Sequence, residues 1–270
     1  MIPKGKIYEF DPGRRVEEIV LVGCGGTGGG IARSLARLMF HMRNMRQDTP
    51  DLTFIDHDTI DETNIGRQMF TPAEIGMNKA QVMARRFNVA MGLQIEARPR
   101  MLRPADFVGE LTQHRDDRKQ IVIGAVDNAA ARKLIHDHAD QLIAWIDAGN
   151  HEFGGQVIIG NCTKPLRTNK VINYRPNNEG QYRHLPAPSL VMPALIEEDD
   201  ETLTCAQLTA MNRQDIFVND WMADVVANYV KKLLLREEIR TFMTFIDTKS
   251  MNMRSVPLTR RNLRARLEQQ

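Results

Sequence analysis

The sequence is poor in cysteine, in net charge and in long apolar runs, and each shortage excludes a class of protein. Its 3 cysteines form no Cys-x-x-Cys pair, which argues against a disulfide framework and against a structural zinc site. A formal net charge of +2 is too small to predict nucleic acid or a membrane as the main partner. No apolar run reaches the roughly 18–20 residues that cross a bilayer, and the N-terminus has no secretory core. We therefore expect a cytoplasmic protein with reduced thiols.

The chain does contain an alternation of short apolar runs and helix-like segments up to residue 160. Strands are predicted where β-branched and apolar residues cluster, and helices where apolar residues recur every three or four positions. The predicted strands cover 17–23, 51–56, 120–127, 142–149 and 154–160, and the predicted helices cover the segment around 31–39, 78–91 and 128–141. This order predicts an α/β fold, a doubly wound Rossmann-like and mostly parallel sheet with helices on both faces.

The pattern changes in the last third of the chain. Residues 176–205 are rich in Pro, Asn, Glu and Asp without periodicity, which predicts a long loop of the kind that often handles substrate. An apolar stripe predicts an amphipathic helix over 215–238. Residues 241–247 and 252–258 alternate like the strands of a hairpin, so antiparallel strands are expected to continue the sheet. The basic tail 260–270 is expected to be a solvated end.

The first predicted strand runs into the glycine-rich segment LVGCGGTGGG, residues 21–30. Gly23, Gly25 and Gly28 have the spacing that lets backbone approach a phosphate at a helix N-terminus, where free N–H groups and the helix dipole favour an anion. Gly26 belongs to the same expected phosphate cradle. Cys24 is expected to be a small packed residue and not a nucleophile. The loop alone does not distinguish a nicotinamide cofactor from ATP.

Polar residues after the later strands favour ATP. Asp56 ends the second strand, where a Rossmann carboxylate binds ribose hydroxyls. Arg67 and Lys79 are cations able to reach a triphosphate, and a nicotinamide cofactor has no γ-phosphate that would need them. Asp127 follows a later strand, where a carboxylate suits Mg²⁺ that bridges phosphate oxygens.

These residues resemble a known family. The segments GCGGTGG, NIGRQ, IGMNKA and the Asp127-Asn128 pair, in this order, are similar to the ThiF/MoeB/HesA superfamily, the bacterial relatives of ubiquitin-activating enzymes. The resemblance covers roughly residues 17–160 and, more loosely, 203–256. Within the superfamily the chain is most similar to the ThiF-family proteins of the plasmid-associated PRTRC system.

The resemblance implies ATP-dependent adenylation of a carboxylate, usually the C-terminal glycine of a small ubiquitin-like or sulfur-carrier protein. Residues 1–270 would form one adenylation domain, with 1–150 as the nucleotide-binding half and 151–270 as the carrier-binding half. Its cofactors would be ATP and Mg²⁺, and its assembly a homodimer. No structural zinc is expected, because the four zinc cysteines of many members are missing.

The roles of the nucleotide-binding residues follow from the same resemblance. Asp56 would bind the ribose. Asn64 and Arg67 would hold the phosphates, with Gln68 in support. Lys79 would stabilise the transition state as pyrophosphate leaves.

The metal and thiol roles are also implied by the family. Asp127 would bind Mg²⁺, with Asn128 beside it. Cys205 follows the long loop, where a mobile thiolate is able to take the activated acyl group, although a purely structural role for Cys205 stays open. Cys162 is expected to be structural.

The sequence departs from the family in a second respect and leaves other functions open. The arginine that some members donate to the partner subunit's site has no clear counterpart here except Arg14 or Arg15. The seven histidines show no metal-ligand spacing. The alternatives are a non-catalytic nucleotide-binding scaffold, a tRNA-nucleoside dehydratase-like adenylating enzyme, or an NAD-dependent oxidoreductase that leaves NIGRQ unexplained.

Overall fold

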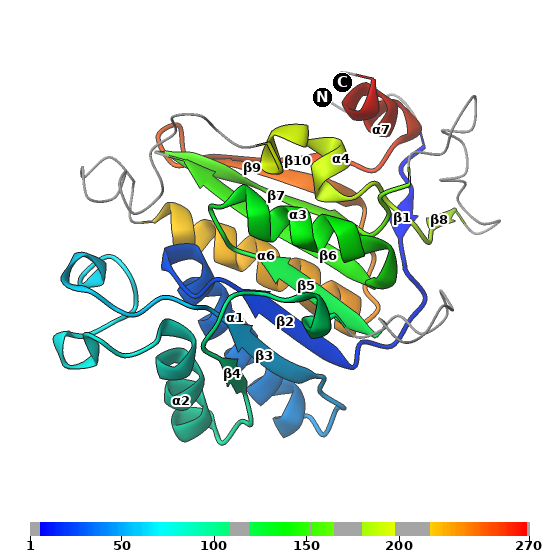
Figure 1. Cartoon of the computed structure of the whole chain (residues 1–270). Coiled ribbons are helices and arrows are strands. Elements are labelled where there is room, and N and C mark those ends of the chain that lie inside the picture. Colours follow the sequence, from blue (N-terminus) through cyan, green and yellow to red (C-terminus); the bar gives the residue numbers. More distant parts are fainter. Residues whose placement is uncertain (1–5, 108–118, 152, 165–179, 198–216, 269–270) are drawn as a thin grey trace.

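One sheet organises the fold, as a computed structural model of the chain shows for residues 6–107, 119–151, 153–164, 180–197 and 217–268. The described residues build an 8-stranded sheet in the order β10-β9-β7-β6-β5-β2-β3-β4 (Figure 1). The strands from β6 to β4 pair in parallel, and β7, β9 and β10 extend the sheet antiparallel from β6. Their bounds are β2 (Glu18–Val22), β3 (Asp51–Ile55), β4 (Glu96–Arg98), β5 (Gln120–Gly124), β6 (Ala144–His151), β7 (Gly154–Gly160), β9 (Thr241–Asp247) and β10 (Asn252–Pro257). The predicted fold class, including the C-terminal antiparallel strands, is confirmed.

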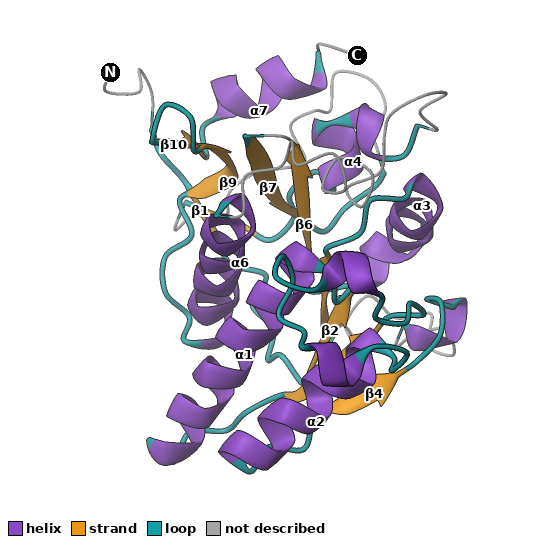
Figure 2. Ribbon diagram, turned by 90° about the vertical axis from the view of Figure 1, so that its left-hand side faces the viewer, coloured by secondary structure: helices purple, strands orange, loops and turns teal. Residues whose placement is uncertain are grey.

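Helices cover both faces of this sheet (Figure 2). The helices α1 (Gly26–Asn44), α2 (Lys79–Met91) and α6 (Val218–Leu234) lie on one face, and α3 (Ala129–His138) and α4 (Pro188–Val191) lie on the other. Alternation along β2 explains why both faces need a cover, because successive side chains of a strand point to opposite sides. Ile19 and Leu21 join the core under α1, α2 and α6, whereas Val20 and Val22 join a second core with Ile135 of α3.

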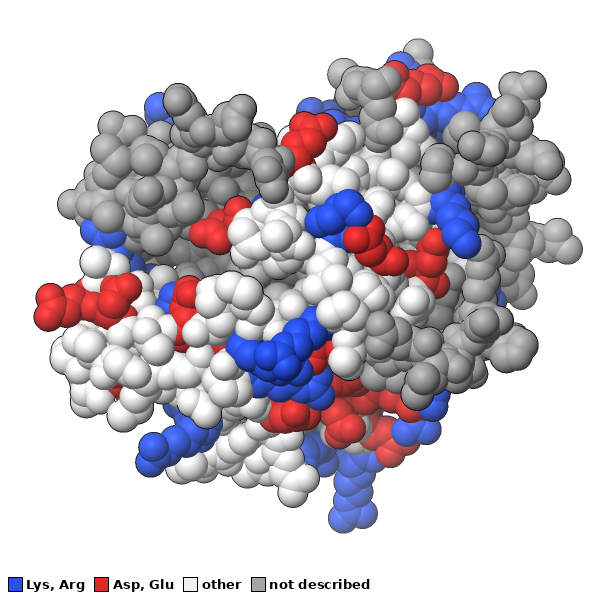
Figure 3. Space-filling model, in the orientation of Figure 1, with Lys and Arg blue, Asp and Glu red and all other residues white. Residues whose placement is uncertain are grey.

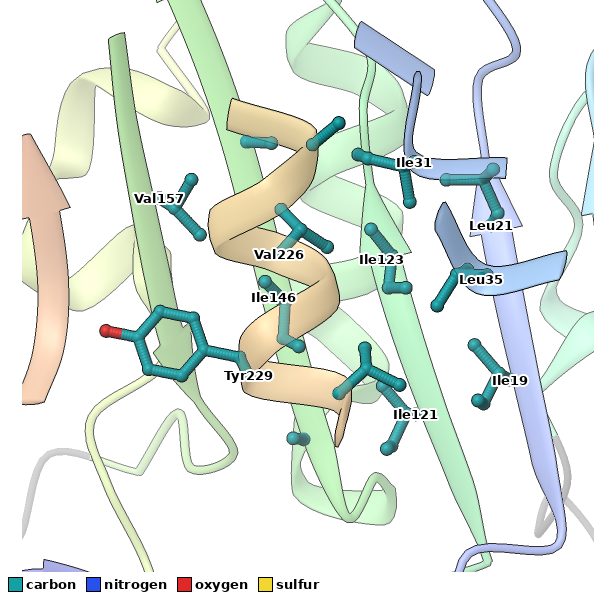
Figure 4. Packing of buried hydrophobic residues seen from close by; sticks show 14 of the residues in the cluster. Ile19, Leu21, Ile31, Leu35, Ile121, Ile123, Ile146, Val157, Val226 and Tyr229 are labelled. Carbon is teal, nitrogen blue, oxygen red and sulfur yellow. The ribbon is translucent and has the colours of Figure 1, made fainter. Parts of the chain in front are cut away.

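The larger core is closed by α6. Figure 4 shows Val226 of this helix near Ile146 and Ile123, with Leu35 of α1 on the far side of Ile123. Tyr229 points the other way, and its hydroxyl lies 3.0 Å from the Thr241 hydroxyl of β9. The helices α1 and α6 also pack on each other. The helix α6, from the second half of the chain, therefore completes the cover of strands that come before residue 152.

Short elements complete the description. The short strand β1 (Glu9–Phe10) pairs in parallel with β8 (Gln181–Tyr182) in a separate 2-stranded sheet. The 3₁₀ turns are η1 (Glu62–Asn64), η2 (Pro72–Glu74), η3 (Pro104–Asp106), η5 (Ala139–Gln141) and η7 (Pro193–Leu195). The prediction of a helix over 128–141 thus corresponds to α3 followed by η5, and the strand predicted over 120–127 ends at Gly124.

The long loop predicted over 176–205 is wrong for its described part, residues 180–197. This part holds β8, α4 and η7, and it buries Tyr182 and Leu185 almost completely. Elements of two to four residues are too short to produce a readable period, and both short helical turns begin with proline, which favours a first helical position. The rest of the predicted loop, with Cys205, lies outside the described residues.

The basic tail is solvated on one side only, because it forms a helix that buries Leu263. Residues Arg260–Leu267 form helix α7, which begins with Thr259 as its cap, because the Thr259 hydroxyl oxygen accepts from the Asn262 N–H at 3.1 Å. Leu263 is only 4% exposed and packs in the larger core. The prediction missed this helix because arginines dominate the segment and only a few apolar residues mark the side that packs on the core.

Charge is mixed on the surface. Figure 3 shows Lys and Arg side chains beside Asp and Glu side chains on the described part of one face. None of the described helices is long and apolar enough to cross a membrane.

A buried ion pair holds α3 against the sheet. The Nε of Arg132 on α3 lies 3.2 Å from Oδ2 of Asp147 on β6, and the two side chains are 11% and 1% exposed. Burial raises the pKa of the Asp147 carboxyl, and the nearby Arg132 opposes this rise. The pair fixes the helix that follows Asp127 and Asn128.

Replacement Asp147→Ala should lower the free energy of unfolding by about 3 kcal/mol, because it leaves the buried Arg132 without its counter-charge. Urea unfolding measures this change. The control is Asp137→Ala, which removes an exposed pair with Lys133 on the same helix and should cost less than about 0.5 kcal/mol. Equal losses in the two variants would contradict the anchoring role of Asp147.

Candidate functional site

A cavity of about 660 Å³ opens where the carboxyl ends of β2, β3 and β5 meet. The chain runs from β2 outward to β3 and β4 and later returns on the other side of β2 to β5, so the strand order reverses at this point. Ligands of open α/β sheets bind at such a reversal, and the volume suits a small molecule. The lining brings together most of the predicted site residues, namely Gly23, Gly25, Gly26, Asp56, Arg67, Gln68, Lys79, Asp127 and Asn128.

Two predicted residues, Gly28 and Asn64, do not line the cavity. A Cβ atom on Gly28 would overlap the carbonyl oxygen of Gly23, so this glycine lets α1 approach the end of β2. Asn64 is buried and stabilises a turn: its Oδ1 accepts from the Asp61 N–H at 3.2 Å, and its carbonyl accepts from the Gln68 N–H at 3.0 Å. Asn64 thereby shapes the segment that carries Arg67 and Gln68, and its predicted phosphate contact stays a prediction.

The glycine loop leaves the start of α1 open toward the cavity. Gly23 has φ +90°, a conformation that favours glycine, and a Cβ there would meet the Ala125 carbonyl oxygen. The N-cap residue of α1 is Gly25, which has no side chain to cap the helix, and the first turn holds no acidic residue. The first N–H groups of α1 therefore have no side-chain cap, and an anion bound here would satisfy them.

Asp56 is a buried carboxylate held by backbone donors. It is 8% exposed at the end of β3, and it accepts from the Cys24 N–H at 2.6 Å and from the Asp58 N–H at 2.8 Å. Burial raises the pKa of Asp56, and these two N–H groups pull it back down. The hydrogen bonds fix the carboxylate beside the glycine loop.

Asp58 pairs with the buried Lys79. Lys79 opens α2, and its Nζ lies 2.9 Å from Oδ2 of Asp58 with the lysine side chain only 9% exposed. Asn78, the cap residue of α2, donates from Nδ2 to the carbonyls of Asp56 and Asp58 at 2.9 and 3.0 Å. The sequence prediction included Lys79 but missed Asp58 and Asn78, although the Asp-x-Asp spacing was visible.

His57 belongs to a group that is compact enough to hold a cation. One possible ligand atom each from Asp56, His57 and Asp58 lie within 4.8 Å of one another. The spacing of the histidines in the sequence did not indicate this group, because the neighbours of His57 in it are aspartates. Its Nε2 lies 3.3 Å from Oδ1 of Asp58.

The remaining predicted residues take different positions around the cavity. Gln68 has a buried Oε1 for which the described residues provide no hydrogen-bond partner, and such an acceptor is costly unless a ligand or water donates to it. Asn128 caps α3, since its Oδ1 accepts from the Ala131 N–H at 2.7 Å. Asp127 is exposed in the loop that follows β5.

One part of the cavity wall is apolar and lies next to Arg100, which is paired with a carboxylate. Met101, Leu102 and Val126 line the cavity and suit the flat apolar surface of a base. Arg100 lies beside them, and its Nη1 and Nη2 bind the carboxylate of Asp106 at 2.7 and 2.6 Å. None of these residues was predicted as a site residue: β4 and the segment after it carry no clear strand pattern, and Val126 falls within the strand predicted over 120–127.

A hydrogen-bonded cluster of Thr27, Asn150 and Asn219 was also missed. These three residues line the cavity beside Gly26 and come from α1, β6 and α6. No spacing in the sequence connects them, since 123 positions separate Thr27 from Asn150 and 69 separate Asn150 from Asn219.

Neither of the described cysteines lines this cavity. Cys24 is completely buried, and burial raises the pKa of its thiol, with the nearby Asp56 adding to the rise. A buried neutral thiol is unreactive, so the prediction that Cys24 is a packed residue is confirmed. Cys162 lies after β7, where its carbonyl accepts from the Ala187 N–H at 2.8 Å.

The chain resembles known proteins in sequence and in structure. The sequence profile described as the ThiF family matches residues 14–266. The ubiquitin-like modifier-activating enzyme 5 of Drosophila ananassae is 26% identical over 147 residues, which are 51% of this chain and 35% of that protein. This chain therefore spans about a third of that relative.

Solved structures of similar fold are larger as well. The structure of E. coli MccB with ATP has a TM-score of 0.54 at 17% identity, and the match covers 90% of this chain and 64% of MccB. PaaA has a TM-score of 0.55 at 16% identity with the same coverage. At these identities the matches show a shared fold.

Replacement of Gly28 and of Gly25 by alanine should show which of the two glycines is required for packing of α1 against β2. Gly28→Ala should destabilise the protein by about 3 kcal/mol or prevent folding, because its Cβ would meet the backbone of Gly23. Gly25→Ala should cost less than about 1 kcal/mol, because the nearest atom to its Cβ is 3.8 Å away on Gln68. Thermal unfolding of both variants measures the difference, and equal stability would contradict the close approach of α1 to β2.

Proposed function

The chain belongs to the ThiF family, and from this premise we propose that it catalyses ATP-dependent adenylation of the C-terminal carboxylate of a small ubiquitin-like or sulfur-carrier protein, with release of pyrophosphate. One observation carries the proposal. The cavity at the strand-order reversal gathers Asp56, Arg67, Lys79 and Asp127 around the uncapped start of α1.

The relatives support both substrates of the proposed reaction. One of the similar proteins is by name an activating enzyme for a ubiquitin-like modifier. One similar structure contains ATP, and another is the microcin C7 biosynthetic enzyme MccB in complex with N-formylated MccA. A nucleotide and the carboxylate of a small protein or peptide are therefore the substrate classes we propose for this chain.

In this reaction a carboxylate oxygen attacks the α-phosphorus of ATP, and the bond from that phosphorus to the pyrophosphate oxygen breaks. The chemistry needs oriented anions and compensation of charge more than it needs a strong base. In our proposal Asp56 binds the ribose, and Arg67 and Lys79 bind the phosphates. Lys79 would then exchange part of its contact with Asp58 for the triphosphate.

Mg²⁺ would complete the charge compensation. When bound, the ion would supply positive charge that offsets the negative charge of the phosphates. Asp127 suits this role because it is an exposed carboxylate on the cavity wall. Its neighbour Asn128 holds the start of α3 in place through its cap.

Further details belong to the same proposal. We propose a homodimer and a relationship to the PRTRC-system proteins, both on the resemblance of the sequence. We also propose that Cys205 takes over the acyl group after adenylation: its thiolate attacks the acyl carbon, a thioester forms and AMP leaves.

The Asp127→Ala variant tests the adenylation step. We expect the wild type with Mg-ATP and its carrier protein to exchange pyrophosphate into ATP, and the variant to lose at least about a hundredfold in rate, because the metal and its charge compensation are lost. The control Asp137→Ala changes an exposed carboxylate on α3 and should keep the wild-type rate. Saturable NAD binding without affinity for ATP in the wild type would refute the proposed function.

Cys205→Ala tests the thioester step separately. The variant should retain pyrophosphate exchange but lose a carrier adduct that thiols cleave, since the acyl acceptor is missing. Mass spectrometry of the intact protein detects the adduct. Cys162→Ala serves as the control, and an adduct that persists in Cys205→Ala would remove Cys205 from the reaction.

A further inference from the structure

Asn219 reaches the glycine loop from the far end of the sequence. It is the second residue of α6, and it lines the cavity beside Gly26. If Gly26 carried a Cβ atom, this atom would lie 2.6 Å from Asn219 Nδ2. The amide nitrogen of Asn219 therefore lies directly against the residue with which α1 begins.

Two hydrogen bonds set the orientation of the Asn219 amide. Its Oδ1 accepts from the Thr27 hydroxyl at 2.7 Å and from the Asn150 Nδ2 at 2.7 Å. Asn150 Nδ2 also donates to the Thr27 hydroxyl oxygen at 3.0 Å, which closes the cluster. Both lone pairs of the amide oxygen are thus occupied, and the amide nitrogen is left to face Gly26.

The donors of Asn219 have no acceptor within the described part of the chain. Its Nδ2 makes no hydrogen bond to any described residue. The start of α1 next to it also lacks a side-chain cap and an acidic residue in its first turn. Backbone donors and a side-chain donor therefore converge at Gly26, and the missing partner at this point is an acceptor, most favourably an anion.

We propose that the Asn219 amide donates to a phosphate oxygen of the nucleotide bound at Gly25 and Gly26. The inference rests on the proposed function, because it takes the ligand of the cavity to be a nucleoside triphosphate. It adds a binding residue from α6 to a site whose other phosphate ligands come from residues before 130. Thr27 and Asn150 act through Asn219 and are positioning residues.

The variant Asn219→Asp keeps the shape of the side chain and an acceptor for Thr27 and Asn150, but it turns a carboxylate oxygen toward the phosphates. An acidic residue in the first turn of α6 suits the helix dipole, so the fold should be retained. Calorimetric titration of the whole chain with Mg-ATP should show a dissociation constant raised by about tenfold or more. Titration with adenosine, which has no phosphate, should show no change.

The matched control is Asn228→Asp. Asn228 is exposed on the same helix, where its Nδ2 donates to the Asp224 carbonyl at 2.9 Å, and its replacement adds the same charge away from the cavity. Affinities for ATP and adenosine should both equal those of the wild type. If Asn219→Asp folds poorly, Asn219→Ala removes the donor without adding charge. It should weaken the binding of ATP but not of adenosine, by a smaller factor than Asn219→Asp.

The outcomes separate this inference from the proposed function. A wild type that does not bind ATP refutes the proposed function. A wild type that binds ATP and an Asn219→Asp variant that binds it equally well overturn the role of Asn219 alone. If the variant binds ATP and adenosine equally more weakly, Asn219 has a structural role. If only the binding of the carrier protein becomes weaker, the amide contacts the acyl carboxylate. Either result also overturns the inference.

Discussion

The contact between the Gly23 carbonyl and the Cα of Gly28 is the constraint on which the rest of the structure depends. It allows α1 to begin immediately after β2, since any side chain at position 28 would push the helix away from the strand. The same turn sends the chain past Ala125 at the end of β5, where Gly23 again leaves no room for a Cβ. The first turn of α1 therefore lies at the reversal of strand order, with its N–H groups at the cavity. The cavity can form here because the turn between β2 and α1 packs through backbone atoms and carries no side chain at Gly23 and Gly28.

Charges around this corner are arranged in pairs before a ligand arrives. Asp56 is stabilised by two backbone N–H groups, and Lys79 by Asp58. A buried lysine without a partner would be costly, and Asp58 provides that partner for Lys79. A triphosphate would compete with Asp58 for Lys79 and would meet a site whose groups are already oriented, which limits the reorganisation that binding requires.

Much of the candidate site could be predicted from the sequence, because it is built from short segments whose chemistry is local. The glycine spacing, Asp56 at a strand end and Lys79 at a helix start each follow from a strand or helix that the pattern already shows. Asn64 was expected to hold the phosphates, which stays a prediction, and its described contacts lie within its own turn. The cluster of Thr27, Asn150 and Asn219 could not be predicted, because only packing brings its members together.

The errors in the last third have a physical cause as well. The elements within 180–197 are held by burial of Tyr182 and Leu185 and not by their own propensity, so no period is visible. Helix α7 has a threonine cap and packs on the core through the buried Leu263 and the partly buried Leu267. Pattern recognition fails where tertiary contacts supply most of the stability of a short segment.

The position of α6 shows that the cavity is not confined to the first 150 residues. This helix packs on α1 through its buried face and carries Asn219 in its first turn. Its start at Val218 follows, in the sequence, the segment that contains Cys205. A displacement of that first turn would break the hydrogen bonds from Thr27 and Asn150 and would withdraw the amide from Gly26. The geometry of the cavity at Gly26 thus depends on α6 as well as on the elements before residue 152.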